Sequence, residues 1–131
     1  MTAYANGTFE VELAPQPMTG SDQDGALSRM SIEKRFLGDL EGTSRGEMLG
    51  ARTDVEDSAG YVAIERVTGI LHGRRGTFIL QHSGTMHRGA HEGFSITVFP
   101  DSGTGDLAGL TAWSTNLRGS RAATAHRPRR G

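Results

Sequence analysis

The sequence predicts an all-β protein, an antiparallel barrel or sandwich of about seven short strands. Nineteen glycines among 131 residues separate short apolar runs, which favours tight turns over helices. Several of these runs alternate between apolar and polar residues, as half-buried strands do. No helix of useful length and no internal repeat is predicted, and a chain of this length forms one domain with a modest core.

The first half of the chain supplies three predicted strands. Residues 8–13 alternate strictly, with Phe9, Val11 and Leu13 on one face. Residues 27–37 and 43–49 form the next two strands, and the glycines around residues 38–42 make a turn or bulge between them.

The second half supplies four more strands, at residues 61–71, 76–86, 94–99 and 107–117. Polar or glycine-rich connections separate them, at residues 50–60, 87–93 and 100–105. Closing such a sheet into a barrel removes its exposed edges, and an eight-stranded barrel has room for one small ligand.

Glu65 and His82 are the most informative residues, because the hairpin formed by residues 61–71 and 76–86 brings them together. Directly opposed Cβ atoms lie about 5 Å apart, within reach of a hydrogen bond. A glutamate can orient a histidine ring and raise its pKa, whereas burial raises the pKa of the glutamate. Either effect produces a general acid or base near neutral pH. The alternative is a solvated face on which the pair is a surface contact.

The turn of this hairpin leaves two registers open. A turn at residues 73–74 pairs Glu65 with His82, whereas a turn at residues 72–73 places Ala63 opposite His82. Two-residue turns preserve pairing parity, so both registers put the same residues on one face. These residues are Tyr61, Ala63, Glu65 and His82.

Glu47 is a further candidate carboxylate, on the predicted strand at residues 43–49. It is in phase with Thr43, Arg45 and Leu49 and could point into a barrel; an exposed strand glutamate is the alternative. Met48 and Trp113 are apolar candidates for the wall of a binding site, together with Tyr61.

Metal and thiol chemistry find little support in the sequence. The chain has no cysteine, which excludes disulfides, thiol catalysis and cysteine-based zinc sites. His87 and His91 fall in a predicted loop, and their spacing from His82 does not match that of metal ligands. We expect neither a metal nor another cofactor.

Charge and hydropathy argue against a nucleic-acid partner and against a membrane partner. The net charge is −1, but all 15 acidic residues lie within residues 1–116, whereas residues 117–131 carry five arginines and no aromatic residue. A dedicated nucleic-acid binder combines basic residues with stacking aromatics on one face, so we expect no nucleic-acid partner. No apolar run approaches a membrane span and the N-terminus has no signal-peptide pattern, which predicts a cytoplasmic protein.

Several motifs in order resemble the DUF3224 domain family, small bacterial proteins with an allene-oxide-cyclase-like β-barrel. They are GTFEVEL, GDLEGTSRGEML, SAGYVAIERVTGILHGRRGTFILQHSG and PDSGTGDLAGL, within residues 6–113. The resemblance implies an eight-stranded antiparallel barrel with a central cavity. It also implies that Glu47, Glu65 and His82, which match recurring polar positions of the family, face that cavity.

The C-terminus departs from the family pattern, which usually ends in a strand rich in aromatics. Residues 117–131 lack alternation, and Pro128 opposes strand pairing. We therefore divide the chain into a barrel at residues 1–116 and an atypical basic tail at 117–131. The barrel then has seven strands plus an altered last one, and its edge is left open, covered by the tail or paired with another subunit.

These observations lead to one predicted function and one alternative. The first is a cofactor-independent isomerase or cyclase that acts on a small, largely apolar molecule, with Glu65, His82 and Glu47 as acid–base residues. Tyr61, Ala63, Met48 and Trp113 would contact the substrate. The alternative is a lipocalin-like protein that binds a small hydrophobic ligand without chemistry.

Overall fold

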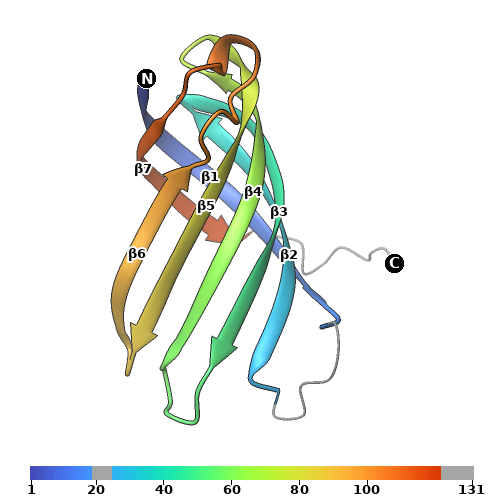
Figure 1. Cartoon of the computed structure of the whole chain (residues 1–131), viewed down its shortest axis with the longest axis vertical. Coiled ribbons are helices and arrows are strands. Elements are labelled where there is room, and N and C mark those ends of the chain that lie inside the picture. Colours follow the sequence, from blue (N-terminus) through green and yellow to red (C-terminus); the bar gives the residue numbers. More distant parts are fainter. Residues whose placement is uncertain (19–24, 122–131) are drawn as a thin grey trace.

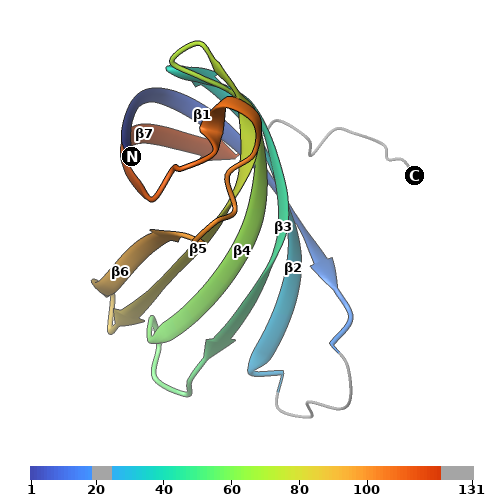
Figure 2. The same cartoon turned by 45° about the horizontal axis from the view of Figure 1, so that its top comes forward.

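The chain forms one strongly curled seven-stranded sheet, a half-barrel (Figures 1 and 2). This computed structural model describes residues 1–18 and 25–121. The strands are β1 (Thr2–Gln16), β2 (Leu27–Gly38), β3 (Leu40–Arg52), β4 (Ala59–Leu71), β5 (Arg74–His87), β6 (Ala90–Val98) and β7 (Ala112–Arg121). Their order across the sheet is β6-β5-β4-β3-β2-β1-β7, which confirms the all-β prediction.

The sheet is mixed rather than wholly antiparallel. Strands β1 to β6 pair antiparallel in sequence order, whereas β7 runs parallel to β1. The connection from β6 stays at one end of the half-barrel, where the backbone N–H of Thr111 donates to the carbonyl of Met1 at 2.8 Å. β7 therefore starts beside the start of β1 and runs in the same direction. Within residues 1–18 and 25–121, β6 and β7 do not pair with each other.

The tail prediction is wrong for its first residues. β7 continues through Arg121, so the boundary predicted after residue 116 falls inside a strand. The predicted strand at 107–117 also starts too early, because a short 3-10 helix at Gly105–Leu107 precedes β7. Leu107 and Leu110 are buried and close one end of the core. The rest of the predicted tail, including Pro128, lies outside the described residues.

Two-residue turns set the registers of the second half. His72 and Gly73 have φ values of 51° and 80°, and positive φ at both central residues is the requirement of a type I′ hairpin turn. This selects the register in which Ala63 opposes His82. A similar turn at Arg88 and Gly89 joins β5 to β6, so residues 90–93 belong to a strand and not to the predicted loop.

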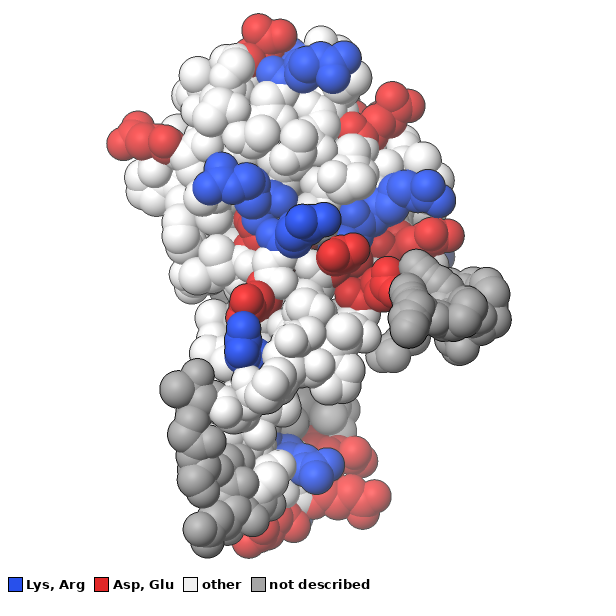
Figure 3. All heavy atoms as spheres, turned by 90° about the vertical axis from the view of Figure 1, so that its right-hand side faces the viewer, with Lys and Arg blue, Asp and Glu red and all other residues white. Residues whose placement is uncertain are grey.

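The two faces of the sheet differ in chemistry. The concave face holds the buried apolar cluster, which includes Phe36, Leu40 and Phe78, with Trp113 packed against it. The outer face is charged: Figure 3 shows a row of basic side chains across it, with Asp and Glu side chains nearby. Arg45 and Arg66 are directly opposed and exposed on this face. Among the described residues, the structure has no helix suited to crossing a membrane.

Candidate functional site

The concave face of β2 to β5 can be followed as cross-strand rows, because directly opposed residues point to the same side. One row contains Ile32, Gly46, Glu65 and Leu80, and Glu65 is its charged member. The adjacent row toward the core contains Lys34 and Ser44, whereas the row on the other side contains His82. Tyr61 lies one row beyond His82.

These five residues form a continuous polar cluster, which we call the Glu65 cluster: Lys34, Ser44, Tyr61, Glu65 and His82. Nζ of Lys34 donates to Oε2 of Glu65 at 2.9 Å, and Oγ of Ser44 donates to Oε1 at 2.7 Å. Nε2 of His82 also bonds Oε2 of Glu65. The Glu65 side chain is 0% exposed, and those of Lys34 and His82 are each 14% exposed.

The contacts of Glu65 keep its carboxyl group ionised. Burial by itself raises the pKa of Glu65, because a charge is poorly solvated in the interior. The hydrogen bond from His82, the charge of Lys34 and the hydrogen bond from Ser44 outweigh burial and lower the pKa to about 2. Glu65 is therefore suited to orient His82 and not to exchange protons near neutral pH, in contrast to the expectation that burial makes it an acid.

His82 connects the buried carboxylate to a phenol. Nδ1 of His82 lies 3.1 Å from Oη of Tyr61, and the two rings meet edge to face with centroids 5.5 Å apart. In the neutral imidazole with its proton on Nε2 directed to Glu65, Nδ1 is an acceptor, and the Tyr61 hydroxyl donates to it. Burial and then the negative charge of Glu65 raise the pKa of Tyr61, which keeps the phenol protonated.

The arrangement resembles a nucleophile–histidine–carboxylate relay in which a phenol takes the first place. Tyr61 is only half-buried and is the outermost member of the cluster. A proton that leaves Tyr61 would pass to His82, and the adjacent carboxylate of Glu65 would stabilise the imidazolium. The relay (Tyr61, His82 and Glu65) is therefore able to accept a proton from a bound molecule and to return it.

The predicted apolar residues divide between two places. Ala63 directly opposes His82, and Met48 directly opposes Ala63, so both line the concave face beside the relay. Trp113 does not lie beside it. Its ring packs against Phe78 in the core, with centroids 5.3 Å apart, and its strand partner is Ala3.

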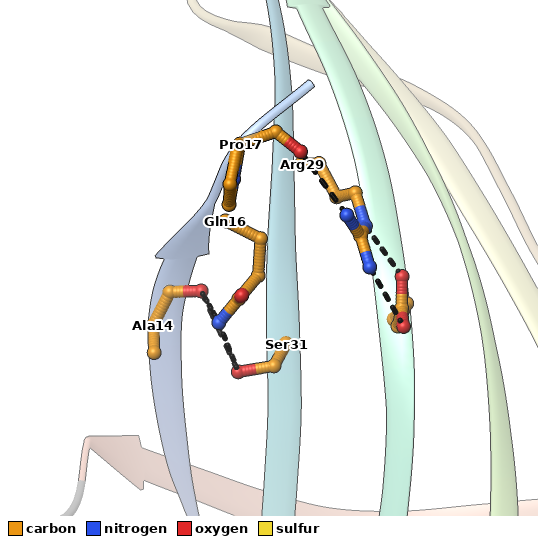
Figure 4. A network of polar contacts seen from close by, with 6 residues as sticks. Ala14, Gln16, Pro17, Arg29 and Ser31 are labelled. Carbon is orange, nitrogen blue, oxygen red and sulfur yellow. Dashed lines mark hydrogen bonds and ion pairs between the residues drawn. The ribbon is translucent and has the colours of Figure 1, made fainter. Parts of the chain in front are cut away.

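Glu47 does not join the Glu65 cluster, and the expectation that it shares a cavity with Glu65 and His82 is wrong. It lies on the outer face with its side chain 57% exposed, and its oxygens accept two hydrogen bonds from Arg29, at 2.7 and 3.2 Å. Arg29 also donates to the carbonyl of Pro17 (Figure 4). The hydrogen bond and charge of Arg29 lower the pKa of Glu47. Glu47 belongs to a surface network.

Lys34 and Ser44 are members of the Glu65 cluster that sequence reasoning missed. Lys34 stands between Ile32 and Phe36 in the alternation of its strand, at a position otherwise filled by buried apolar residues. A lysine in that phase indicates a buried carboxylate partner, because buried charges are paired. Nζ of Lys34 also lies 4.8 Å from the ring centroid of Phe9, a cation–π contact.

Gly46 permits the close approach of β3 and β4 at Glu65. A Cβ atom at this position would lie 1.9 Å from the carbonyl oxygen of Ile64 and 2.7 Å from Cα of Glu65. We expect Gly46→Ala to destabilise the protein by about 1–3 kcal/mol, since the clash involves backbone that cannot rotate away. Gly50→Ala, on the same strand and face, should cost less, because its closest contact is 3.3 Å. Urea unfolding checks this, and equal costs would contradict it.

The other histidines among the described residues lie apart from the relay. Nδ1 of His87 is 3.8 Å from Oε2 of Glu92 on the exposed side of the β5–β6 hairpin. Within the described residues, no group of three or more His, Asp or Glu side chains is arranged to hold a metal ion. We therefore take the Glu65 cluster as the candidate functional site.

Comparisons with known proteins identify the family. A family model described as "Protein of unknown function (DUF3224)" matches residues 5–125. The chain belongs to the DUF3224 family. A solved structure of a DUF3224 protein of unknown function from Shewanella oneidensis MR-1 is 48% identical and has a TM-score of 0.73. The match covers 79% of this DUF3224 chain and 77% of the other. No curated protein matches the present chain.

Proposed function

We propose that this DUF3224 protein is a cofactor-independent isomerase or cyclase, and that its substrate is a small, largely apolar molecule bound on the concave face. The observation that carries the proposal is the relay from Tyr61 through His82 to the buried, ionised Glu65. The apolar row of Met30, Met48 and Ala63 beside His82 supports an apolar substrate. The analogy with allene oxide cyclases operates at the level of the fold alone, and the fold does not define the reaction.

The relay supplies both halves of an isomerisation. A hydrogen on a substrate carbon next to a carbonyl leaves as a proton to the oxygen of Tyr61, while the phenolic proton moves to Nδ1 of His82. The electron pair of the broken C–H bond enters the substrate as an enolate. Return of the protons along the same path to another substrate atom completes the reaction without an oxidant or reductant. Tyr61 is the catalytic residue, and His82, Glu65 and Lys34 are positioning residues.

Proton exchange into a ketone tests this proposal without knowledge of the natural substrate. β-Tetralone in D2O should lose its α-protons faster with the protein than with buffer, as followed by proton NMR. Because a positioned acid–base group contributes at least about a hundredfold, Tyr61→Phe and His82→Ala should each lower the protein-dependent rate by about that factor.

Tyr4→Phe is the matched control, since Tyr4 and Tyr61 are the two tyrosines and Tyr4 is 54% exposed. It should leave the exchange rate unchanged, with all variants folded by circular dichroism. Exchange that is equally fast in the parent, Tyr61→Phe and His82→Ala proteins would refute the proposed acid–base role.

A binding protein without chemistry is the second candidate function, and the exposure of Phe94 favours it. This large aromatic side chain is 64% exposed. A hydrophobic ligand that covers it would gain binding energy without a proton transfer. In that case apolar ketones bind to the protein, but no variant of the relay changes the exchange of their protons.

A further inference from the structure

A narrow gap above Gly84 lies beside the relay. Gly84 on β5 directly opposes Tyr61 on β4. A carbon atom at the Cβ position of Gly84 would lie 3.3 Å from Cε1 of Tyr61 and 3.6 Å from Cδ1 of Phe94. Carbon atoms in contact lie about 3.5–4.0 Å apart, so the space between these two ring atoms holds at most about one carbon layer.

The strand irregularity at this point directs Phe94 toward the gap. The β5–β6 register shifts between Ser83 and Thr85, and Gly93 has a φ of 63°. Bulges of this kind re-aim a neighbouring side chain and are common next to active sites. The ring of Phe94 lies at the gap but remains 64% exposed, so it is not packed into the hydrophobic core.

Glycines occupy both positions directly opposite Tyr61, so no side chain stands directly beside its ring in its own row. Gly50 opposes it on β3 and Gly84 opposes it on β5. The next row provides Met48 and Ala63, and a methionine thioether adapts to irregular apolar shapes. A molecule in the gap would thus contact aromatic carbon on two sides, with the Tyr61 hydroxyl nearby.

These contacts define a class of substrate, and the inference rests on the proposed function. We infer that the site binds a molecule with a flat conjugated or aromatic part, inserted between Tyr61 and Phe94 above Gly84, with a carbonyl oxygen near the Tyr61 hydroxyl. A saturated ring is thicker than one carbon layer and does not fit. Conjugation would also spread the charge of the enolate that forms when a proton is removed.

Binding of two matched ketones tests the inference. The probes are benzalacetone, which is flat and conjugated, and its fully hydrogenated cyclohexyl analogue. Aromatic contacts contribute about 0.5–1.5 kcal/mol, so benzalacetone should bind about two- to tenfold more tightly than the analogue. Dissociation constants are measured on the full chain by titration followed by proton NMR, which requires no turnover.

Alanine substitutions at Gly84 and Gly50, the two glycines that directly oppose Tyr61, test on which side of Tyr61 the ligand binds. Gly84→Ala places a methyl group in the gap and should remove the preference for benzalacetone. Gly50→Ala places one on the other side of Tyr61, 3.7 Å from its Cβ, and should preserve the preference. Phe94→Leu, which retains apolar area but removes the ring, should also lower the preference.

The outcomes separate this inference from the proposed function. Equal affinities for the two ketones, an unchanged preference in Gly84→Ala, or no binding of benzalacetone up to its solubility limit would each overturn the inference. If the flat ketone is preferred but β-tetralone exchange is absent, the ligand class stands and the proton transfer fails. If β-tetralone exchange occurs but flat ketones are not preferred, the proton transfer stands and the inferred ligand class fails.

Discussion

Glu65→Gln is expected to lower the free energy of unfolding by about 3–5 kcal/mol, the cost of removing one partner from a buried ion pair. The substitution retains the shape of the side chain but removes its charge, which leaves the ammonium group of Lys34 without its counterion at 14% exposure. His82 also loses the charged acceptor of its Nε2 proton. Urea unfolding followed by circular dichroism measures the change.

Two further variants isolate the charge as the cause. Glu47→Gln removes a carboxylate that also binds a cation, Arg29, but does so on the exposed outer face. Its unfolding midpoint should stay close to that of the parent, because solvent screens exposed pairs. The double variant Lys34→Met with Glu65→Gln should recover most of the stability lost in Glu65→Gln, since no uncompensated cation remains. A double variant as unstable as Glu65→Gln would show that the ion pair is not the source of the effect.

The hairpin at the centre of the site was predictable because its physics is local. Alternation identifies β4 and β5, and a two-residue turn preserves parity whichever residues form it. Tyr61, Ala63, Glu65 and His82 could therefore be placed on one face before the register was known. The choice between the two registers required the turn conformation, in which His72 has a positive φ that a non-glycine residue seldom adopts.

Glu47 was misplaced because glycines hide the inner face of β3. The concave positions of this strand include Gly42, Gly46 and Gly50, which carry no side chain and give no hydrophobic signal. Leu49 on the outer face then suggests the opposite phase, although it is 49% exposed. The phase is determined instead by pairing with β4, where Gly46 opposes Glu65. The alternation of residues within one strand does not show how that strand pairs with a neighbouring strand.

The last residues of β7 were missed for a different reason. These residues, from Leu117 to Arg121, show no regular alternation. They form a strand because their backbone groups pair with β1, from Gly7 to Val11, and this pairing depends little on side-chain type at a sheet edge. Whether a second subunit pairs with an edge of the sheet stays a prediction, and sedimentation of the purified chain would test it.

The low pKa of Glu65 makes acid stability the second large effect. The pKa falls from 4.5 to about 2 on folding, so the folded state binds this proton less readily than the unfolded state does. The stabilisation from Glu65 is therefore complete above about pH 4.5 and is lost as the pH falls toward 2. The difference in pKa corresponds to roughly 3 kcal/mol. The side chain is fully buried, so added salt should change this value little.

Comparison of the parent with Glu65→Gln isolates this contribution, because every other carboxylate titrates in both proteins. The free energy of unfolding should differ most above pH 5, and the two curves should converge near pH 2, where a protonated Glu65 is as neutral as glutamine. Glu47→Gln should instead follow the parent over the whole range, apart from the small contribution of its exposed pair with Arg29. Curves for the parent and Glu65→Gln that stay parallel from pH 7 to pH 2 would mean that Glu65 is not held ionised. Its role as the anchor of His82 would then have to be abandoned, and with it the relay to Tyr61.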